Sequence, residues 1–166
     1  VLPGVIAVMT AGCLAPPGSQ IRTTSLAPER RALVRTALQQ IGTRYRMGGT
    51  SPATGFDCSG LALYVYSKHH IKLPHSSRAQ YNDGKKLSTK QIRPGDLLFF
   101  NINGRGISHV GIYIGGGRFV HAPSSGKSVR TDEVRNPYWK SGIAGERGIF
   151  ELIFFDYGLP RLIFTV

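Results

Sequence analysis

Residues 108–121 read Ser-His-Val-Gly-Ile-Tyr-Ile-Gly-Gly-Gly-Arg-Phe-Val-His, and this stretch decides the fold. Two runs with strand character, 109–114 and 118–121, are joined by three consecutive glycines, which is typical of a tight β-hairpin. A further apolar run at 97–100 follows the turn signal Pro94-Gly95-Asp96. We therefore expect three short strands in this part of the chain, arranged as an antiparallel sheet.

Because side chains alternate along a strand, the hairpin also predicts where its two histidines point. Val110 and Ile112 share one face of the first strand, and His109 lies on the other. If the three glycines form the loop, His121 falls on the same face as His109, and Val120 joins the apolar face. The register that buries the apolar side chains together therefore brings the histidines together as well.

Two amphipathic helices are expected before the strands. The first begins near Pro28 and ends at Gly42, and its apolar positions are Leu33, Val34, Ala37, Leu38 and Ile41. A glycine-rich loop follows, and then Asp57 as N-cap with Cys58 as the first residue of the second helix. The inward-facing residues of this second helix are Leu61, Ala62, Val65 and Tyr66. With a short helix and turns between Pro74 and Lys90, the order of elements predicts an α+β domain.

Cys58 occupies a position with chemical consequences. The unpaired N–H groups and partial positive charge at a helix start stabilise a thiolate, so a lowered thiol pKa is expected. A lone cysteine on an amphipathic helix is more often a small core residue. A pair of histidines on one face of a hairpin, however, supplies a base and a group that orients it. We therefore predict that Cys58, His109 and His121 are catalytic, and that Gly60 keeps the approach to the thiol open.

The chain is strongly basic, with 21 Lys+Arg against 9 Asp+Glu and a net charge of +12. Such a balance favours anionic partners, which include nucleic acid, acidic membrane surfaces and cell-wall polymers. The basic residues are scattered, with no long run and no recognisable nucleic-acid-binding module. We therefore expect no nucleic-acid partner.

The N-terminal segment has the features of a secretory signal. Cys13 follows an apolar stretch at residues 5–12 that is too short to span a bilayer. The run from Thr10 to Cys13 resembles a bacterial lipobox, so Cys13 is a candidate for lipidation and a membrane tether. We predict a signal remnant at 1–13, a linker at 14–28, a catalytic domain at 29–149 and an apolar tail of unknown role at 150–166.

Four motifs, in order along the chain, resemble those of the NlpC/P60 family of cell-wall cysteine peptidases. They are Phe56-Asp57-Cys58-Ser59-Gly60-Leu61, Arg93-Pro94-Gly95-Asp96-Leu97-Leu98-Phe99-Phe100, Ser108-His109-Val110-Gly111-Ile112-Tyr113-Ile114-Gly115 and Arg118-Phe119-Val120-His121-Ala122-Pro123. Tyr45-Arg46-Met47-Gly48-Gly49 matches the loop before the nucleophile, and the resemblance covers residues 30–149. His75 departs from the family, which often has Arg there.

The resemblance implies a papain-like α+β fold, with N-terminal helices packed on a central antiparallel sheet. It also implies hydrolysis of peptidoglycan stem peptides next to D-glutamate or diaminopimelate. Cys58 takes the position of the nucleophile, His109 that of the base and His121 that of the orienting group. The residues that the family's motifs place at the oxyanion site and along the substrate cleft are Tyr45, Asp57, Ser59 and Ser108.

We therefore expect a monomeric thiol endopeptidase of the bacterial envelope that needs no metal or other cofactor. Its location would be the periplasm, the outer membrane as a lipoprotein, or outside the cell. The same triad could serve a papain-like amidase or acyltransferase, since the acyl-enzyme step is shared. Two other classes stay open. Cys58, His109 and His121 could be three ligands of a zinc ion, or the domain could be a non-catalytic basic module that binds cell wall or nucleic acid.

Overall fold

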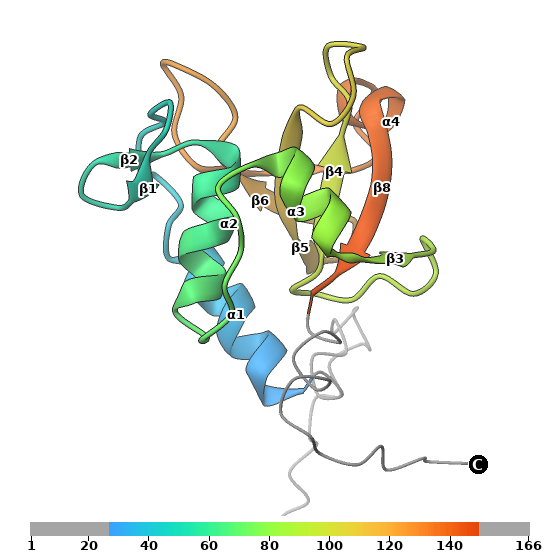
Figure 1. Cartoon of the computed structure of the whole chain (residues 1–166), viewed down its shortest axis with the longest axis horizontal. Coiled ribbons are helices and arrows are strands. Elements are labelled where there is room, and N and C mark those ends of the chain that lie inside the picture. Colours follow the sequence, from blue (N-terminus) through green and yellow to red (C-terminus); the bar gives the residue numbers. More distant parts are fainter. Residues whose placement is uncertain (1–26, 150–166) are drawn as a thin grey trace, which may run out of the picture.

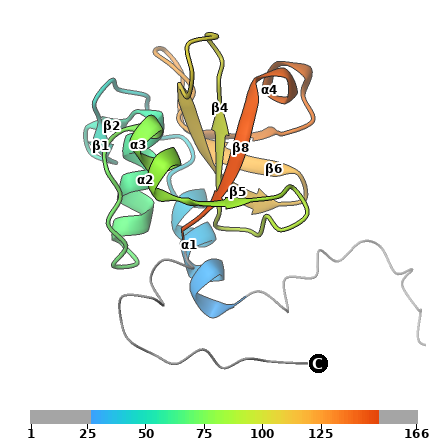
Figure 2. The same ribbon diagram turned by 45° about the vertical axis from the view of Figure 1, so that its right-hand side comes forward.

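In the computed structural model, which describes residues 27–149, a six-stranded antiparallel sheet carries helices on both faces (Figures 1 and 2). The strands lie in the order β3 (Lys85–Leu87), β8 (Ile143–Gly148), β4 (Leu97–Phe100), β5 (His109–Gly115), β6 (Arg118–His121) and β7 (Arg130–Glu133). One side of the sheet carries α1 (Pro28–Leu38), α2 (Cys58–Ser67) and α3 (Ser77–Asp83), and the other carries α4 (Pro137–Gly142). A small hairpin of β1 (Thr50–Ser51) and β2 (Gly55–Phe56) precedes α2. The predicted α+β class is confirmed.

The prediction that both histidines share one face of the hairpin is confirmed. Val110, Ile112 and Val120 belong to the core on the helix side, and Ile112 pairs with Val120 across the two strands. His109 and His121 lie on the opposite face, with His109 Nε2 2.9 Å from His121 Nδ1. The core packing and the histidine pair thus share one register.

The turn of the hairpin differs from the predicted one. Gly115 belongs to β5 and pairs with Arg118, and the register shifts between Tyr113 and Gly115. The loop is therefore formed by Gly116 and Gly117, both with positive φ. The shift absorbs one residue near the turn, so it leaves the pairing nearer the histidines unchanged.

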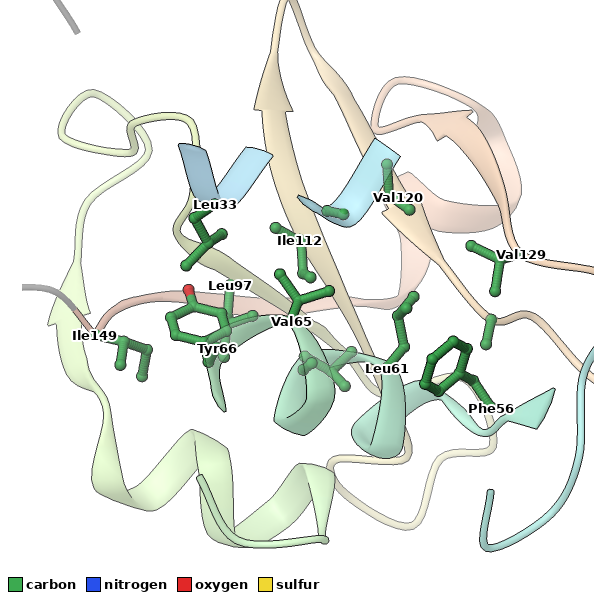
Figure 3. Packing of buried hydrophobic residues seen from close by; sticks show 14 of the residues in the cluster. Leu33, Phe56, Leu61, Val65, Tyr66, Leu97, Ile112, Val120, Val129 and Ile149 are labelled. Carbon is green, nitrogen blue, oxygen red and sulfur yellow. The ribbon is translucent and has the colours of Figure 1, made fainter. Parts of the chain in front are cut away.

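The larger core lies between the sheet and helices α1 and α2 (Figure 3). The predicted inward face of α2 is confirmed, since Leu61, Ala62, Val65 and Tyr66 are all buried. The apolar face of α1 is shorter than predicted. Its helix ends at Leu38, and Leu38 and Ile41 are 40% and 47% exposed. The chain turns away after Leu38 and continues toward Val129, whose carbonyl accepts a hydrogen bond from Gly42.

A second, smaller core covers the face of the sheet that carries the histidines. It consists of Leu98, Phe100, Phe119 and Trp139. Gly111 makes this packing possible, because a Cβ there would lie only 2.4 Å from Phe119 Cδ2. The absence of a side chain lets the Phe119 ring pack directly over Gly111, and Trp139 of α4 packs beside both histidines.

Three strands of the sheet were not predicted: β3, β7 and β8. β8 has the sequence Ile-Ala-Gly-Glu-Arg-Gly and shows no apolar alternation, yet it lies between β3 and β4. Its Arg147 donates from Nε to Tyr81 O at 2.9 Å, and the guanidinium lies 3.5 Å from the centroid of the Tyr81 ring. Backbone pairing with β3 and β4 holds this strand in the sheet, and the contacts of Arg147 with Tyr81 add to it.

Several predictions concern residues outside the described range. These are the signal remnant at 1–13 with Cys13, nearly all of the linker at 14–28, and the tail at 150–166. Within residues 27–149, none of the helices has the length and apolar character needed to cross a membrane.

A buried ion pair holds α1 against the turn that begins β4. Arg30 Nη1 lies 2.7 Å from Asp96 Oδ1 and also donates to Pro94 O at 3.1 Å. Asp96 is only 1% exposed, and its second oxygen accepts from the Arg93 backbone N–H at 2.8 Å. The carboxylate therefore joins α1 to the turn that precedes β4.

Arg30→Ala should lower the free energy of unfolding by about 3 kcal/mol, because it leaves the buried Asp96 carboxylate without its nearest cation. The matched control is Arg31→Ala, which removes an exposed guanidinium from the next position of the helix. This control should change the free energy by less than about 0.5 kcal/mol. Urea unfolding followed by circular dichroism measures both variants. Equal losses would show that the ion pair does not anchor α1.

Candidate active site

Asp57 connects three segments at the start of α2. As predicted it is the N-cap, and its Oδ1 accepts from Gly60 N at 2.7 Å and from Ser59 Oγ at 3.0 Å. Its Oδ2 accepts from Gly48 N at 2.9 Å, while His75 Nε2 lies 3.1 Å and 3.0 Å from the two oxygens. The carboxylate thus fixes the helix start, the loop before it and the segment after it. Contact of Asp57 or Ser59 with substrate stays a prediction.

Gly60 has a packing role that differs from the predicted one. A Cβ at this position would lie 2.0 Å from Gly49 O, and a Cβ on Gly49 would lie 2.3 Å from Gly55 O. The three glycines let the loop and the β1–β2 hairpin meet the start of α2 backbone to backbone. Gly60 therefore makes room for the protein's own loop, and the prediction that it opens access to the thiol has no support in these contacts.

Cys58 is the first residue of α2, as predicted, and its thiol lies against the start of β5. Burial raises the pKa of this thiol to about 11, and the Asp57 carboxylate adds to the rise. Hydrogen bonding from the backbone amides of Val110, Ser59 and Cys58 itself lowers the pKa, but by less than burial raises it. The predicted lowering of the thiol pKa by the helix N-terminus is therefore wrong for the free protein. At neutral pH the thiol is protonated.

His109 and His121 form a buried pair. The two side chains are 4% and 0% exposed. The Val110 backbone that the Cys58 thiol contacts directly follows His109 in β5, so the thiol lies at the end of the strand that carries this histidine. Trp139 covers the pair: its ring stacks on His109 with centroids 5.2 Å apart and meets His121 edge-on at 4.8 Å.

The histidine pair continues into a carboxylate, Asp132, that sequence reasoning missed. On β7, Asp132 Oδ2 lies 3.1 Å from His121 Nε2 and accepts from Trp139 Nε1 at 2.9 Å. Arg130 Nη2 also donates to this oxygen, at 3.0 Å. No apolar alternation marks β7 as a strand, so no signal in the sequence placed Asp132 beside His121.

Burial keeps both imidazoles neutral at physiological pH. It lowers the pKa of His109 to about 3, and the neighbouring His121 adds to that effect. It lowers the pKa of His121 to about 4, even though the Asp132 carboxylate raises it. For Asp132 itself, partial burial raises the pKa, but hydrogen bonds from Arg130 and Trp139 bring it below the usual value. The line therefore consists of two neutral imidazoles and one carboxylate.

Tyr45 lies near the thiol, whereas the hydroxyl of Ser108 bonds within its own loop. Burial raises the pKa of Tyr45, and a negative charge on Cys58 raises it further, which places the two groups close together. The Tyr45 hydroxyl donates to Met47 Sδ at 3.7 Å. Ser108 Oγ accepts from Ile102 N at 3.0 Å. An oxyanion role for Tyr45 and a cleft position for Ser108 stay predictions.

The zinc alternative does not fit the arrangement of the three residues. His109 Nε2 and His121 Nδ1 lie 2.9 Å apart and bond to each other, so these nitrogens do not converge on a common ion. Across residues 27–149, no three His, Cys, Asp or Glu side chains are grouped as a metal site.

Comparisons with known proteins identify the family of the chain. The model of the NlpC/P60 family matches residues 42–147. The murein DD-endopeptidase MepH of Escherichia coli is 39% identical over 116 residues, which are 68% of this chain and 43% of that protein. The gamma-DL-glutamyl hydrolase of Bacillus subtilis is 44% identical over 117 residues, which are 69% of this chain and 28% of that protein. The chain thus spans less than half the length of these curated relatives.

A solved structure shows the same fold. It is described as similar to lipoprotein, NLP/P60 family, and comes from Staphylococcus aureus. It is 32% identical with a TM-score of 0.66, and the match covers 79% of this chain and 45% of that one. With a family model that matches most of the described residues and relatives near 40% identity, the chain belongs to the NlpC/P60 family.

Proposed function

We propose that this protein is a thiol endopeptidase that cleaves the stem peptides of peptidoglycan, with Cys58 as nucleophile, His109 as base and His121 as the orienting group. One observation carries the proposal. A helix-start cysteine lies against the end of β5 that bears His109, and His109 is in turn bonded to His121 at 2.9 Å. Nucleophile, base and orienting group are the three parts that an activated thiol needs.

The neutral resting state sets the order of the chemical steps. His109 takes the thiol proton as the Cys58 sulfur attacks the peptide carbonyl, so it is a general base rather than one half of a standing ion pair. The Cys58 backbone N–H and the Tyr45 hydroxyl stabilise the oxyanion. His109 then gives the proton to the leaving amine. Water hydrolyses the resulting thioester with His109 again as base, and the thiol is restored.

The bond next to D-glutamate or diaminopimelate is the proposed point of cleavage. The name of the Bacillus subtilis relative, a gamma-DL-glutamyl hydrolase, supports this choice. The name of the Escherichia coli relative, a murein DD-endopeptidase, favours a D,D-linkage as the second candidate. The net charge of +12 suits the anionic wall polymer that we propose as the substrate.

We further propose that the protein works in the bacterial envelope, as a monomer and without a cofactor. Cys13, outside the described residues, is the proposed site of a lipid tether. Such a tether would hold the catalytic domain within reach of the wall while leaving its chemistry unchanged.

Incubation with purified sacculi tests the proposed function. The wild type should release peptide fragments, and mass spectrometry of their ends should separate cleavage beside D-glutamate from cleavage of a D,D-linkage. Cys58→Ala should release none, because it removes the thiol on which the proposed acyl-enzyme forms. Cys13→Ser is the matched control and should keep full activity on sacculi. Absence of release by the wild type would overturn the proposal.

Substitutions of the two histidines should separate their roles. His109→Ala should lower kcat by about 10²–10⁴-fold, because proton transfer is lost. His121→Asn should retain more activity than His121→Ala, since an amide can still bond to His109 Nε2. His69→Ala, which removes a histidine beyond the far end of α2, is the control and should be fully active. Full activity of His121→Ala would remove His121 from the mechanism.

The resting thiol should react slowly at neutral pH. In Cys13→Ser protein, where Cys58 is the sole cysteine, labelling by iodoacetamide should rise about tenfold per pH unit toward pH 11, because the thiolate is the reactive form. The same protein in guanidinium should level off near the usual thiol pKa of about 8.5. A plateau near pH 7 in the folded protein would instead indicate a standing thiolate–imidazolium pair.

A further inference from the structure

We propose that Asp132 is a positioning residue that selects which ring nitrogen of His109 acts as the base. This inference rests on the proposed thiol-peptidase function. It starts from the line of contacts that joins His109 Nε2 to His121 Nδ1 at 2.9 Å and His121 Nε2 to Asp132 Oδ2 at 3.1 Å. Each contact fixes which of its two atoms carries the hydrogen. The choice at Asp132 therefore fixes the protonated nitrogen of His121, and that in turn fixes the protonated nitrogen of His109.

The carboxylate sets the first limit. An ionised Asp132 has no proton to donate, so the hydrogen of its contact with His121 must belong to His121 Nε2. The other two partners of Asp132 Oδ2, Trp139 Nε1 and Arg130 Nη2, are donors only, and they hold the oxygen as an acceptor. Three donors converge on one carboxylate oxygen, which favours its ionised form.

Protonation of His121 on Nε2 in turn determines which nitrogen of His109 is protonated. A neutral imidazole carries one N–H, so with Nε2 protonated the Nδ1 of His121 has a lone pair. That lone pair can only accept, and the hydrogen of the 2.9 Å contact therefore belongs to His109 Nε2. The remaining nitrogen of His109, Nδ1, is left with a lone pair. A general base for Cys58 needs such a lone pair.

Burial makes the selection necessary. Both rings are almost fully enclosed. A second proton on either ring would therefore place a charge in a buried site at a high free-energy cost, and water cannot replace the hydrogen-bond partners of the rings. Two arrangements of the histidine pair then satisfy the same contact: both rings protonated on Nε2, or both on Nδ1. In the second arrangement, His109 Nδ1 carries a hydrogen and cannot accept the thiol proton. The carboxylate of Asp132 bonds only to the first.

Asp132→Leu tests this role. His121 Nε2, Trp139 Nε1 and Arg130 Nη2 all meet the same oxygen, Oδ2, so Asn could keep that oxygen as acceptor, whereas a leucine of similar shape removes it. Without this acceptor, nothing on β7 favours the arrangement with both rings protonated on Nε2. We expect kcat on a soluble muropeptide to fall at least about tenfold with KM unchanged, as loss of the correct tautomer does in serine proteases. The circular dichroism spectrum should stay that of the wild type.

Glu133→Gln is the matched control. Glu133 is the next residue of β7, its side chain is half exposed, and it pairs with Arg135 rather than with the histidines. The substitution removes the same unit of charge and should leave kcat unchanged. If both variants lost activity equally, the net charge rather than the tautomer would be responsible, and the inference would be overturned.

A second measurement needs no activity. ¹⁵N NMR of histidine-labelled Cys58→Ala protein should show Nε2 protonated and Nδ1 without a proton in both His109 and His121, and Asp132→Leu should abolish this preference. Rings protonated on Nδ1 in the protein with Asp132 intact would overturn the inference even if the enzyme were active. Conversely, a wild type that cleaves no sacculi refutes the proposed function, while the spectra still decide the role of Asp132.

Discussion

The alternation of side chains along β5 is the constraint on which the rest of the structure depends. Val110 and Ile112 enter the core against α1 and α2, and this forces His109 to the face covered by Trp139. β6 has the same division, so His121 joins His109. A slip of one residue would bury His109 among apolar groups and turn Val110 toward Trp139. The core and the candidate site therefore both depend on the pairing register of β5 with β6.

Local signals predicted the parts of the fold that are locally encoded. The N-cap at Asp57, the inward face of α2 and the β5–β6 hairpin all follow from short-range spacing, and the structure confirms each. β7 and β8 are polar strands held by pairing and by contacts far away in the chain, so no window of sequence marks them. Asp132 was missed for this reason. The thiol pKa was misjudged because sequence shows a helix start but not the burial around it.

Burial has a double effect on the chemistry of the site. It leaves the thiol and both imidazoles neutral at rest, so Cys58 is not already a thiolate before substrate binds. It also protects the thiol, since oxidants and alkylating agents attack the thiolate rather than the protonated form. In the proposed role of an envelope enzyme, where conditions are oxidising, a thiol that becomes charged only during attack would keep its activity longer.

The contact between Gly60 and Gly49 also bears on any attempt to redirect the proposed peptidase toward other peptides. Loop and helix meet there with no side chain between them, so the loop that carries Tyr45 cannot be rebuilt without displacing the helix start at Cys58. The segment between β6 and β7 is tied to the same loop, since Tyr45 N donates to Lys127 O at 2.8 Å and Val129 is buried in the core. The exposed Tyr138 of α4 takes no part in these contacts, which makes it the better position for substitutions that aim at selectivity.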